Sequence, residues 1–111
     1  MAKKKNKKID ELIYRFAEEL KKDIPIEKIL LFGSYAQGKS KIDSDIDLIV
    51  VSPTFAKGKY IANMQYLFRK ASKLNSLLEP IPAAPSEIKN FDRRVFPGQI
   101  IESAKVYNFI Q

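Results

Sequence analysis

The sequence predicts a single small α/β (α+β) domain, with a mixed β-sheet of about four strands flanked by helices. The chain has 111 residues, which is enough to bury one core and too few for two. Segments with helical spacing of apolar residues alternate with short segments rich in β-branched residues, which is typical of this fold class. No internal repeat or linker divides the chain, so we expect one domain.

The chain opens with a lysine-rich segment. Residues 1–8 hold five lysines and no acid, whereas the remaining residues hold 15 basic and 13 acidic side chains. Most of the formal charge of +7 therefore belongs to this segment. We expect residues 1–8 to form a flexible basic arm and residues 9–111 to form the folded domain. A weak phosphate or nucleic-acid hook is the alternative role for the arm.

A first helix is predicted over residues 9–22. Its apolar residues recur at three- and four-residue spacing, which gives the helix one apolar face. Asp10 and Glu11 lie at its expected start, where acids complement the helix dipole, and Pro25 ends it.

Two strands, a second helix and a third strand are predicted next. Residues 27–32 and 46–51 are apolar segments that end at turn residues, which is typical of buried strands. Residues 59–75 repeat the amphipathic spacing of a helix. Residues 77–81 form a third short strand, and Pro80 within it indicates a sheet edge or a strand end.

Shorter elements are predicted in the last quarter of the chain. Residues 85–91 open like a helix, with a serine as a possible cap. Residues 98–103 are expected to add a helical turn. Residues 105–110 are expected to form the last strand of the sheet.

His, Cys and Trp are absent from the composition. A chain without His and Cys has no Ser-His-Asp triad, no Cys-His pair and no disulfide, and an ordinary zinc site is not expected. Any catalysis must use carboxylates, Lys, Arg, Tyr, hydroxyls or a metal with oxygen ligands. No apolar run reaches the roughly 18 residues of a transmembrane helix, and no secretory signal is visible. We therefore expect a cytoplasmic protein.

Residues 31–51 carry the candidate site. Asp45 and Asp47 lie two apart on a predicted strand, so both carboxylates share a face. Two acids in an apolar strand repel each other and resist burial, and a divalent cation would resolve that conflict. Gly33 and Ser34 end the preceding strand, where a glycine backbone and a serine hydroxyl can approach a phosphate. The alternative is an Asp-rich strand entrance that faces solvent.

The Gly-Ser pair and the Asp-x-Asp strand together resemble a known signature. Gly33-Ser34, ten intervening residues and then Asp45 and Asp47 are similar to the signature of the DNA polymerase β-type nucleotidyltransferase superfamily. The small size resembles that of its minimal nucleotidyltransferases, which include the MntA-like antitoxins of HEPN/MNT modules. The resemblance is close over residues 31–51 and extends over nearly all of the predicted domain. It implies a polymerase β-like nucleotidyltransferase fold.

The resemblance also implies a third carboxylate on a neighbouring strand. Glu79 is the candidate, because it is the downstream acid that lies in a strand-like apolar segment. The alternative for Glu79 is a solvent-facing residue before a proline. Gln37 stands where many relatives carry Arg, so Lys39 and Lys41 are the residues expected to replace part of that charge at the phosphates. Glu79 is itself a departure from the commoner Asp.

The function that the resemblance implies is metal-dependent transfer of a nucleoside monophosphate, AMP from ATP, to an acceptor hydroxyl. Two Mg²⁺ or Mn²⁺ ions are expected at Asp45, Asp47 and Glu79, with the phosphates at Gly33 and Ser34. A Tyr of a helical HEPN-type toxin is the acceptor that an antitoxin role implies. The alternative is a weak or inactive nucleotide-binding module that acts by contact with its partner. Nucleic acid is not expected as the main partner, and the oligomeric state is open.

Overall fold

The computed structural model describes residues 2–33, 45–57, 59–89 and 104–109. The elements along the chain are α1 (Ala2–Lys21), β1 (Lys28–Phe32), β2 (Ile46–Val51), a short 3-10 helix η1 (Pro53–Ala56), α2 (Tyr60–Leu74), β3 (Leu78–Ala83), α3 (Pro85–Lys89) and β4 (Lys105–Asn108). The strands form one four-stranded sheet in the order β3-β2-β1-β4. β1 pairs antiparallel with β2 and β4, while β2 and β3 are parallel. The predicted mixed sheet flanked by helices is confirmed.

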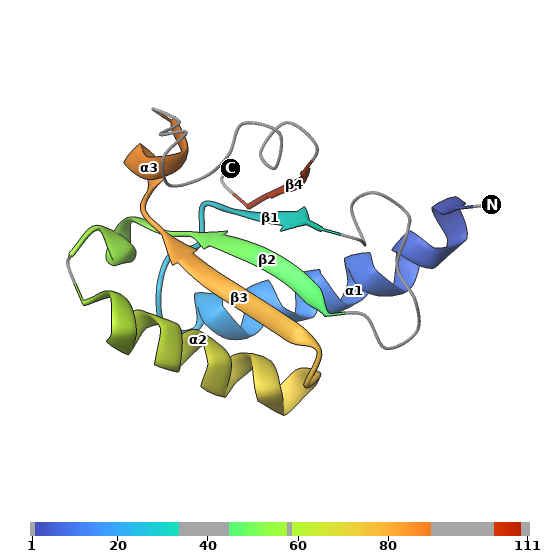
Figure 1. Cartoon of the computed structure of the whole chain (residues 1–111), viewed down its shortest axis with the longest axis horizontal. Coiled ribbons are helices and arrows are strands. Elements are labelled where there is room, and N and C mark those ends of the chain that lie inside the picture. Colours follow the sequence, from blue (N-terminus) through green and yellow to red (C-terminus); the bar gives the residue numbers. More distant parts are fainter. Residues whose placement is uncertain (1, 34–44, 58, 90–103, 110–111) are drawn as a thin grey trace.

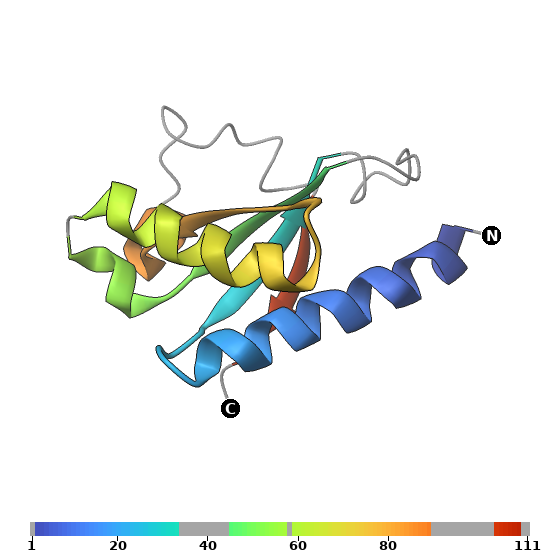
Figure 2. The same ribbon diagram turned by 90° about the horizontal axis from the view of Figure 1, so that it is seen from below.

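Helices α1 and α2 lie side by side on one face of the sheet (Figure 1 and Figure 2). The main core fills the space between them and the sheet, where Phe16, Leu20, Leu48 and Leu67 are fully buried. Alternation along the strands sends every second residue to the opposite face. That face carries a smaller apolar cluster, which consists of Leu30, Ile49, Val51 and Ala83.

Helix α1 begins at Ala2, seven residues before its predicted start. Alanine and lysine are good helix formers, so a lysine-rich segment can extend a helix that packing has already stabilised. The predicted helix start at residue 9 is therefore wrong, and the flexibility of the basic arm stays a prediction. Asp10 and Glu11 lie inside the helix, and its first turn holds no acid, which contradicts the predicted pairing with the helix dipole. The domain boundary between residues 8 and 9 stays a prediction.

Other boundaries differ from prediction at the strand ends. β3 continues to Ala83 because it pairs with β2 over its full length. The 3-10 helix η1 was not expected, and it begins where the buried Ser52 hydroxyl accepts a hydrogen bond of 3.1 Å from the Thr54 backbone N–H. The predicted turn at residues 98–103 lies outside the described residues. Of the helices in the described ranges, none combines the length and apolar character needed to cross a membrane.

Candidate active site

Asp47 and Glu79 lie opposite each other on the parallel strands β2 and β3. Residues in register on neighbouring strands share a face of the sheet. Ile46 and Leu48, on either side of Asp47, belong to the core beneath the helices. Both carboxylates therefore project from the face that α1 and α2 leave uncovered, as the Asp-x-Asp spacing predicts for β2.

Asp45 completes the carboxylate cluster at the entrance of β2. It directly precedes the strand and is exposed. Glu79 lies close enough to Asp45 for the two side chains to interact, so residues that are 34 positions apart in the sequence meet at this point. The structure thus brings together the three acids that the sequence nominated.

The acids in this cluster have raised pKa values. Partial burial, followed by the charge of Asp45, raises the pKa of Asp47. Partial loss of solvent raises the pKa of Glu79, and the hydrogen bond with Asp45 and the charges of Asp45 and Asp47 raise it further. Like charges this close disfavour each other's ionised form. The cluster is therefore an environment that favours an added positive charge.

Gly33 brings the end of β1 against this cluster. Its φ is +75°, a conformation that glycine adopts without strain. A Cβ atom at this position would lie 2.5 Å from Asp47 Oδ2, which is closer than real Cβ contacts allow. A side chain at position 33 would therefore displace the Asp47 carboxylate from this arrangement. The neighbouring Phe32 is the register partner of Asp47 on β1.

Phe32 was not predicted as a neighbour of the site. Strand alternation places it on one face of β1, but the register between β1 and β2 depends on how the intervening segment turns. No sequence signal specifies that register. The other predicted phosphate-binding residues, Ser34, Lys39 and Lys41, lie outside the described residues.

The donor set of the cluster fits a hard divalent cation. Within the described ranges, no three His, Cys, Asp or Glu side chains are already arranged around a common metal position. Mg²⁺ does not need such a ready-made cage, because it is usually held by one or two carboxylates together with waters and substrate phosphates. Asp45, Asp47 and Glu79 offer oxygen ligands only, as that chemistry requires.

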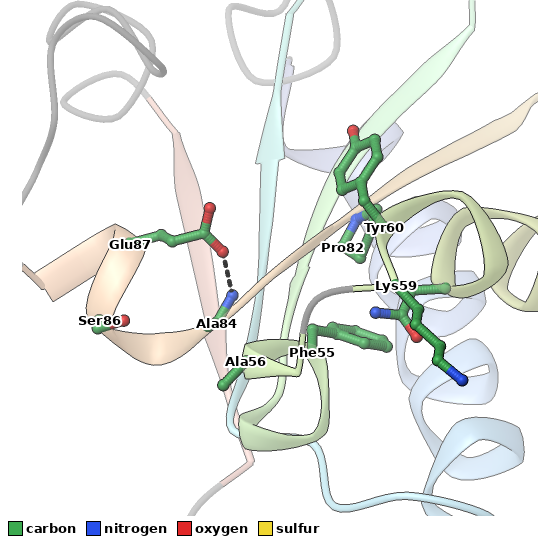
Figure 3. Close-up of a pocket in the computed structure, with 9 residues that line it drawn as sticks. Phe55, Ala56, Lys59, Tyr60, Pro82, Ala84, Ser86 and Glu87 are labelled. Atoms are coloured by element: carbon green, nitrogen blue, oxygen red, sulfur yellow. Dashed lines mark hydrogen bonds between the residues drawn. The ribbon is translucent and has the colours of Figure 1, made fainter.

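A separate pocket of about 300 Å³ lies at the other end of β3, beside the start of α2 (Figure 3). The Glu87 carboxylate in this pocket accepts a hydrogen bond of 2.7 Å from the Ala84 backbone N–H, which caps α3. Lys59 and Tyr60 line its α2 side. The pocket contains none of the predicted site residues.

The family described as "Nucleotidyltransferase domain" matches residues 13–107. The chain belongs to this nucleotidyltransferase family. The matched range contains the whole carboxylate cluster and Gly33. The family predicted from the Gly-Ser pair and the Asp-x-Asp strand is confirmed.

A curated relative and two solved structures resemble this nucleotidyltransferase domain. A protein of Methanocaldococcus jannaschii, named provisionally as a protein adenylyltransferase, is 43% identical over 42 residues, which cover 38% of this chain and 49% of that protein. The match thus spans about half the length of the curated relative. A crystal structure from Sulfolobus solfataricus, described provisionally as a nucleotidyltransferase, has a TM-score of 0.63 at 21% identity and covers 80% of this chain and 78% of that chain. This second likeness supports the fold alone.

The other solved structure is described as a toxin-antitoxin with AMP-PNP. It has a TM-score of 0.61 at 27% identity, and the alignment covers 91% of this chain and 73% of that chain. Both likenesses extend over most of the chain, so the fold as a whole recurs in these structures.

Proposed function

We propose that this nucleotidyltransferase domain transfers AMP from ATP to an acceptor hydroxyl, in a reaction that depends on Mg²⁺ or Mn²⁺. The observation that carries the proposal is the cluster of Asp45, Asp47 and Glu79 on the uncovered face of the sheet. The name of the Methanocaldococcus relative supports an adenylyl group as the group transferred. The AMP-PNP in the toxin-antitoxin structure supports an adenine nucleotide as the donor.

Asp45, Asp47 and Glu79 would hold the divalent ions. When bound, such ions neutralise phosphate charge and favour the ionised form of an attacking hydroxyl. The backbone at Gly33 has the freedom to approach the phosphates, because no side chain stands between it and Asp47. Ser34, Lys39 and Lys41 remain the residues proposed to bind the phosphates.

Glu79 is the residue proposed to accept the acceptor's proton. The chain contains no His, and a carboxylate is the base that the cluster itself can supply. A carboxylate with a raised pKa is a stronger base than an ordinary one, and the pKa of Glu79 is raised. Glu79 is also exposed on the edge strand β3, where an acceptor can reach it.

A protein hydroxyl is the proposed acceptor, with a Tyr of a helical HEPN-type toxin as the specific candidate. The toxin-antitoxin structure supports this choice, because a chain of that structure aligns with 91% of this chain. The domain would then act as the antitoxin by modifying its partner. The cytoplasmic location expected from the sequence stays a prediction.

The test is incubation with labelled ATP, Mg²⁺ and the purified product of the neighbouring gene. We expect label on that partner with wild type, and a loss of about 100-fold or more with Asp45→Asn or Asp47→Asn, as for loss of a central catalytic group. Glu18→Gln is the matched control, because Glu18 is an exposed carboxylate on α1 far along the chain from the cluster. Equal labelling by wild type and Asp47→Asn would overturn the proposal. A partner that co-purifies without being labelled would favour a module that acts by contact alone.

A further inference from the structure

The segment between Asp47 and Glu79 carries no acidic residue. It contains five basic residues, which are Lys57, Lys59, Arg69, Lys70 and Lys73. Outside it, residues 9–111 hold 10 basic and 13 acidic side chains, so the positive charge of the domain is concentrated here. Lys70 pairs with Asp23 of the α1–β1 connection at 3.0 Å, and the other four basic side chains are exposed. The charge is therefore displayed at the surface of η1 and α2.

An apolar stripe runs along the same helix. Ile61 is 66% exposed and Phe68 is 39% exposed. Residues seven apart lie on one side of a helix about 10 Å from each other. The half-buried Met64 lies between them. Two large exposed apolar side chains in line form a patch, whereas scattered ones would be unremarkable on a protein surface.

This stripe faces away from α1. Tyr66 and Lys70 lie on the opposite side of α2 from Ile61 and Phe68, given 100° of rotation per residue. Tyr66 and Lys70 are the residues that contact Asp23, at 2.7 Å and 3.0 Å. α2 packs against the edge strand β3 and lies beside α1 (Figure 2). The side of α2 turned away from α1 is therefore its outer side, and helical rotation places the stripe there.

The adjoining edge of β3 is unsuited to strand pairing. Ile46 and Ser52 donate backbone hydrogen bonds to Leu77 and Ala83, so the odd-numbered residues of β3 bond toward β2. The even-numbered residues face outward, and two of the three in the strand are Pro80 and Pro82. Proline has no N–H to offer a further strand. A partner on this side must therefore bind through side chains, and α2 supplies them.

We propose that the outer face of α2, made up of Ile61, Met64, Phe68 and Arg69, docks a protein whose contact surface is apolar at its centre and acidic at its rim. A second copy of this chain would bring the same basic residues against one another, which is unfavourable. A nucleic acid would use the basic residues but leave the apolar stripe in water. The pocket beside Lys59 and Tyr60 offers a recess for one anchoring side chain of the partner (Figure 3).

The identity of this partner as the acceptor rests on the proposed function. β3 connects the two sites, because it packs on α2 and also carries Glu79. Glu79 projects from the opposite face of the sheet, so a protein seated on the outer face of α2 would reach it by extending around the edge strand β3. Docking at this face would therefore hold an acceptor hydroxyl near the carboxylate cluster and contribute through proximity.

The test compares matched pairs of exposed substitutions. Ile61→Thr combined with Arg69→Glu alters the outer face of α2, whereas Val106→Thr combined with Arg15→Glu makes the same types of change on β4 and α1. The probe is the purified product of the neighbouring gene, and affinity is measured by calorimetry at low and high salt. We expect affinity to fall about tenfold or more in the α2 variant only, as for loss of interface anchors. Wild-type affinity should also fall with added salt.

Further measurements distinguish a loss of docking from a loss of folding and from self-association. Circular dichroism melting verifies that each variant folds, and Arg69→Gln provides a second α2 change that removes charge alone. Unchanged affinity in both α2 variants, or equal losses in the β4–α1 control, overturns the docking proposal. A loss of wild-type self-association in the α2 variant, seen by sedimentation, would identify a second copy as the occupant and also overturn it. Stabilisation by ATP and Mg²⁺, measured without partner, reports separately on the nucleotide site.

Discussion

Asp47 meets three constraints at a single residue. It lies opposite Glu79 on one side and Phe32 on the other, and its Oδ2 atom occupies the space that a side chain at position 33 would need. Burial and the charge of Asp45 both raise its pKa. Such an arrangement is costly for the empty fold, and sites of this kind are expected where function requires the charge.

Replacing Gly33 with Ala tests the close approach at Asp47. We expect a stability loss of about 1–2 kcal/mol from the positive φ. We also expect a fall of about 100-fold in AMP transfer, since misplacing a reacting group by about 1 Å has an effect of this size. Chemical denaturation and labelling with ATP measure the two effects. Gly33→Asn separates the two effects, because Asn tolerates a positive φ but its side chain would still contact Asp47. Wild-type turnover by either variant would contradict the prediction.

Neutralising Asp47 is expected to stabilise the chain at neutral pH. A carboxylate whose pKa is raised by folding binds protons more tightly in the folded state, so its penalty is absent below the ordinary carboxylate pKa of about 4 and fully present above the raised value. Asp47→Asn removes that penalty. The melting temperature should rise by a few degrees at pH 7, since about 1 kcal/mol corresponds to roughly 4 °C in a domain of this size.

The gain from Asp47→Asn should shrink as the pH falls and vanish below about 4, where wild-type Asp47 is protonated in both the folded and the unfolded state. Melting curves by circular dichroism between these pH values measure the trend. Glu18→Gln, which changes an exposed carboxylate on α1, should show no comparable gain. A stability gain for Asp47→Asn that is constant with pH would mean that charge is not its cause.

At the scale of elements, α1 and α2 are linked through Asp23, which follows the end of α1. The Tyr66 hydroxyl donates a hydrogen bond to Asp23, and Lys70 pairs with the same carboxylate. Both contacts lower the pKa of Asp23, while partial burial and the bond to Asp23 raise the pKa of Tyr66. At the other end of the sheet, Lys105 and Tyr107 of β4 both bind Asp10 of α1. These contacts hold the two-helix layer in place beneath the strands that carry the site.

The prolines of β3 are expected to prevent pairing at this sheet edge. Pro80→Val combined with Pro82→Val restores two outward N–H groups on an exposed edge, which is a template for strand addition. We expect the double variant to self-associate with increasing concentration, as measured by sedimentation velocity. Pro25→Ala, which changes an exposed proline outside the sheet, should behave like wild type. The same sedimentation profile for the double variant and wild type would rule out this role.

At the scale of the whole molecule, the two faces of the sheet have different roles. The helix-covered face holds the main core, and the opposite face carries the acids. The core is thereby separated from the repulsive charges of the site, which lie at one end of the strands. Removing those charges therefore need not disturb the fold.

A divalent cation should stabilise the whole chain through the carboxylate cluster. A ligand that binds only the folded state adds about 2.7 kcal/mol at 100 times its dissociation constant. We expect Mg²⁺ or Mn²⁺, and more strongly either ion with AMP-PNP, to raise the wild-type melting temperature. Asp45→Asn combined with Asp47→Asn should abolish the effect, and Na⁺ at equal ionic strength should not reproduce it. If Mg²⁺ or Mn²⁺ still raises the melting temperature of the double variant, the metal binds somewhere other than this cluster.

The sequence by itself determined the class of chemistry and the local geometry of β2. The absence of His and Cys excludes imidazole and thiol chemistry, and the period of two along a strand puts Asp45 and Asp47 on one face. Such statements are accessible because they depend on neighbours in the chain. The family signature depends on them too, and the family is confirmed.

Which distant residues lie beside Asp45 and Asp47 depends on the tertiary structure. Strand register depends on the path of the chain between strands, and a shift of one residue moves a side chain to the other face. The α2 crossover sets Glu79 opposite Asp47, and the β1–β2 pairing sets Gly33 and Phe32 beside it. The start of α1 also escaped prediction, because lysines are compatible with both a helix and a solvated arm. Local periodicity can be predicted from the sequence, whereas strand register depends on tertiary packing.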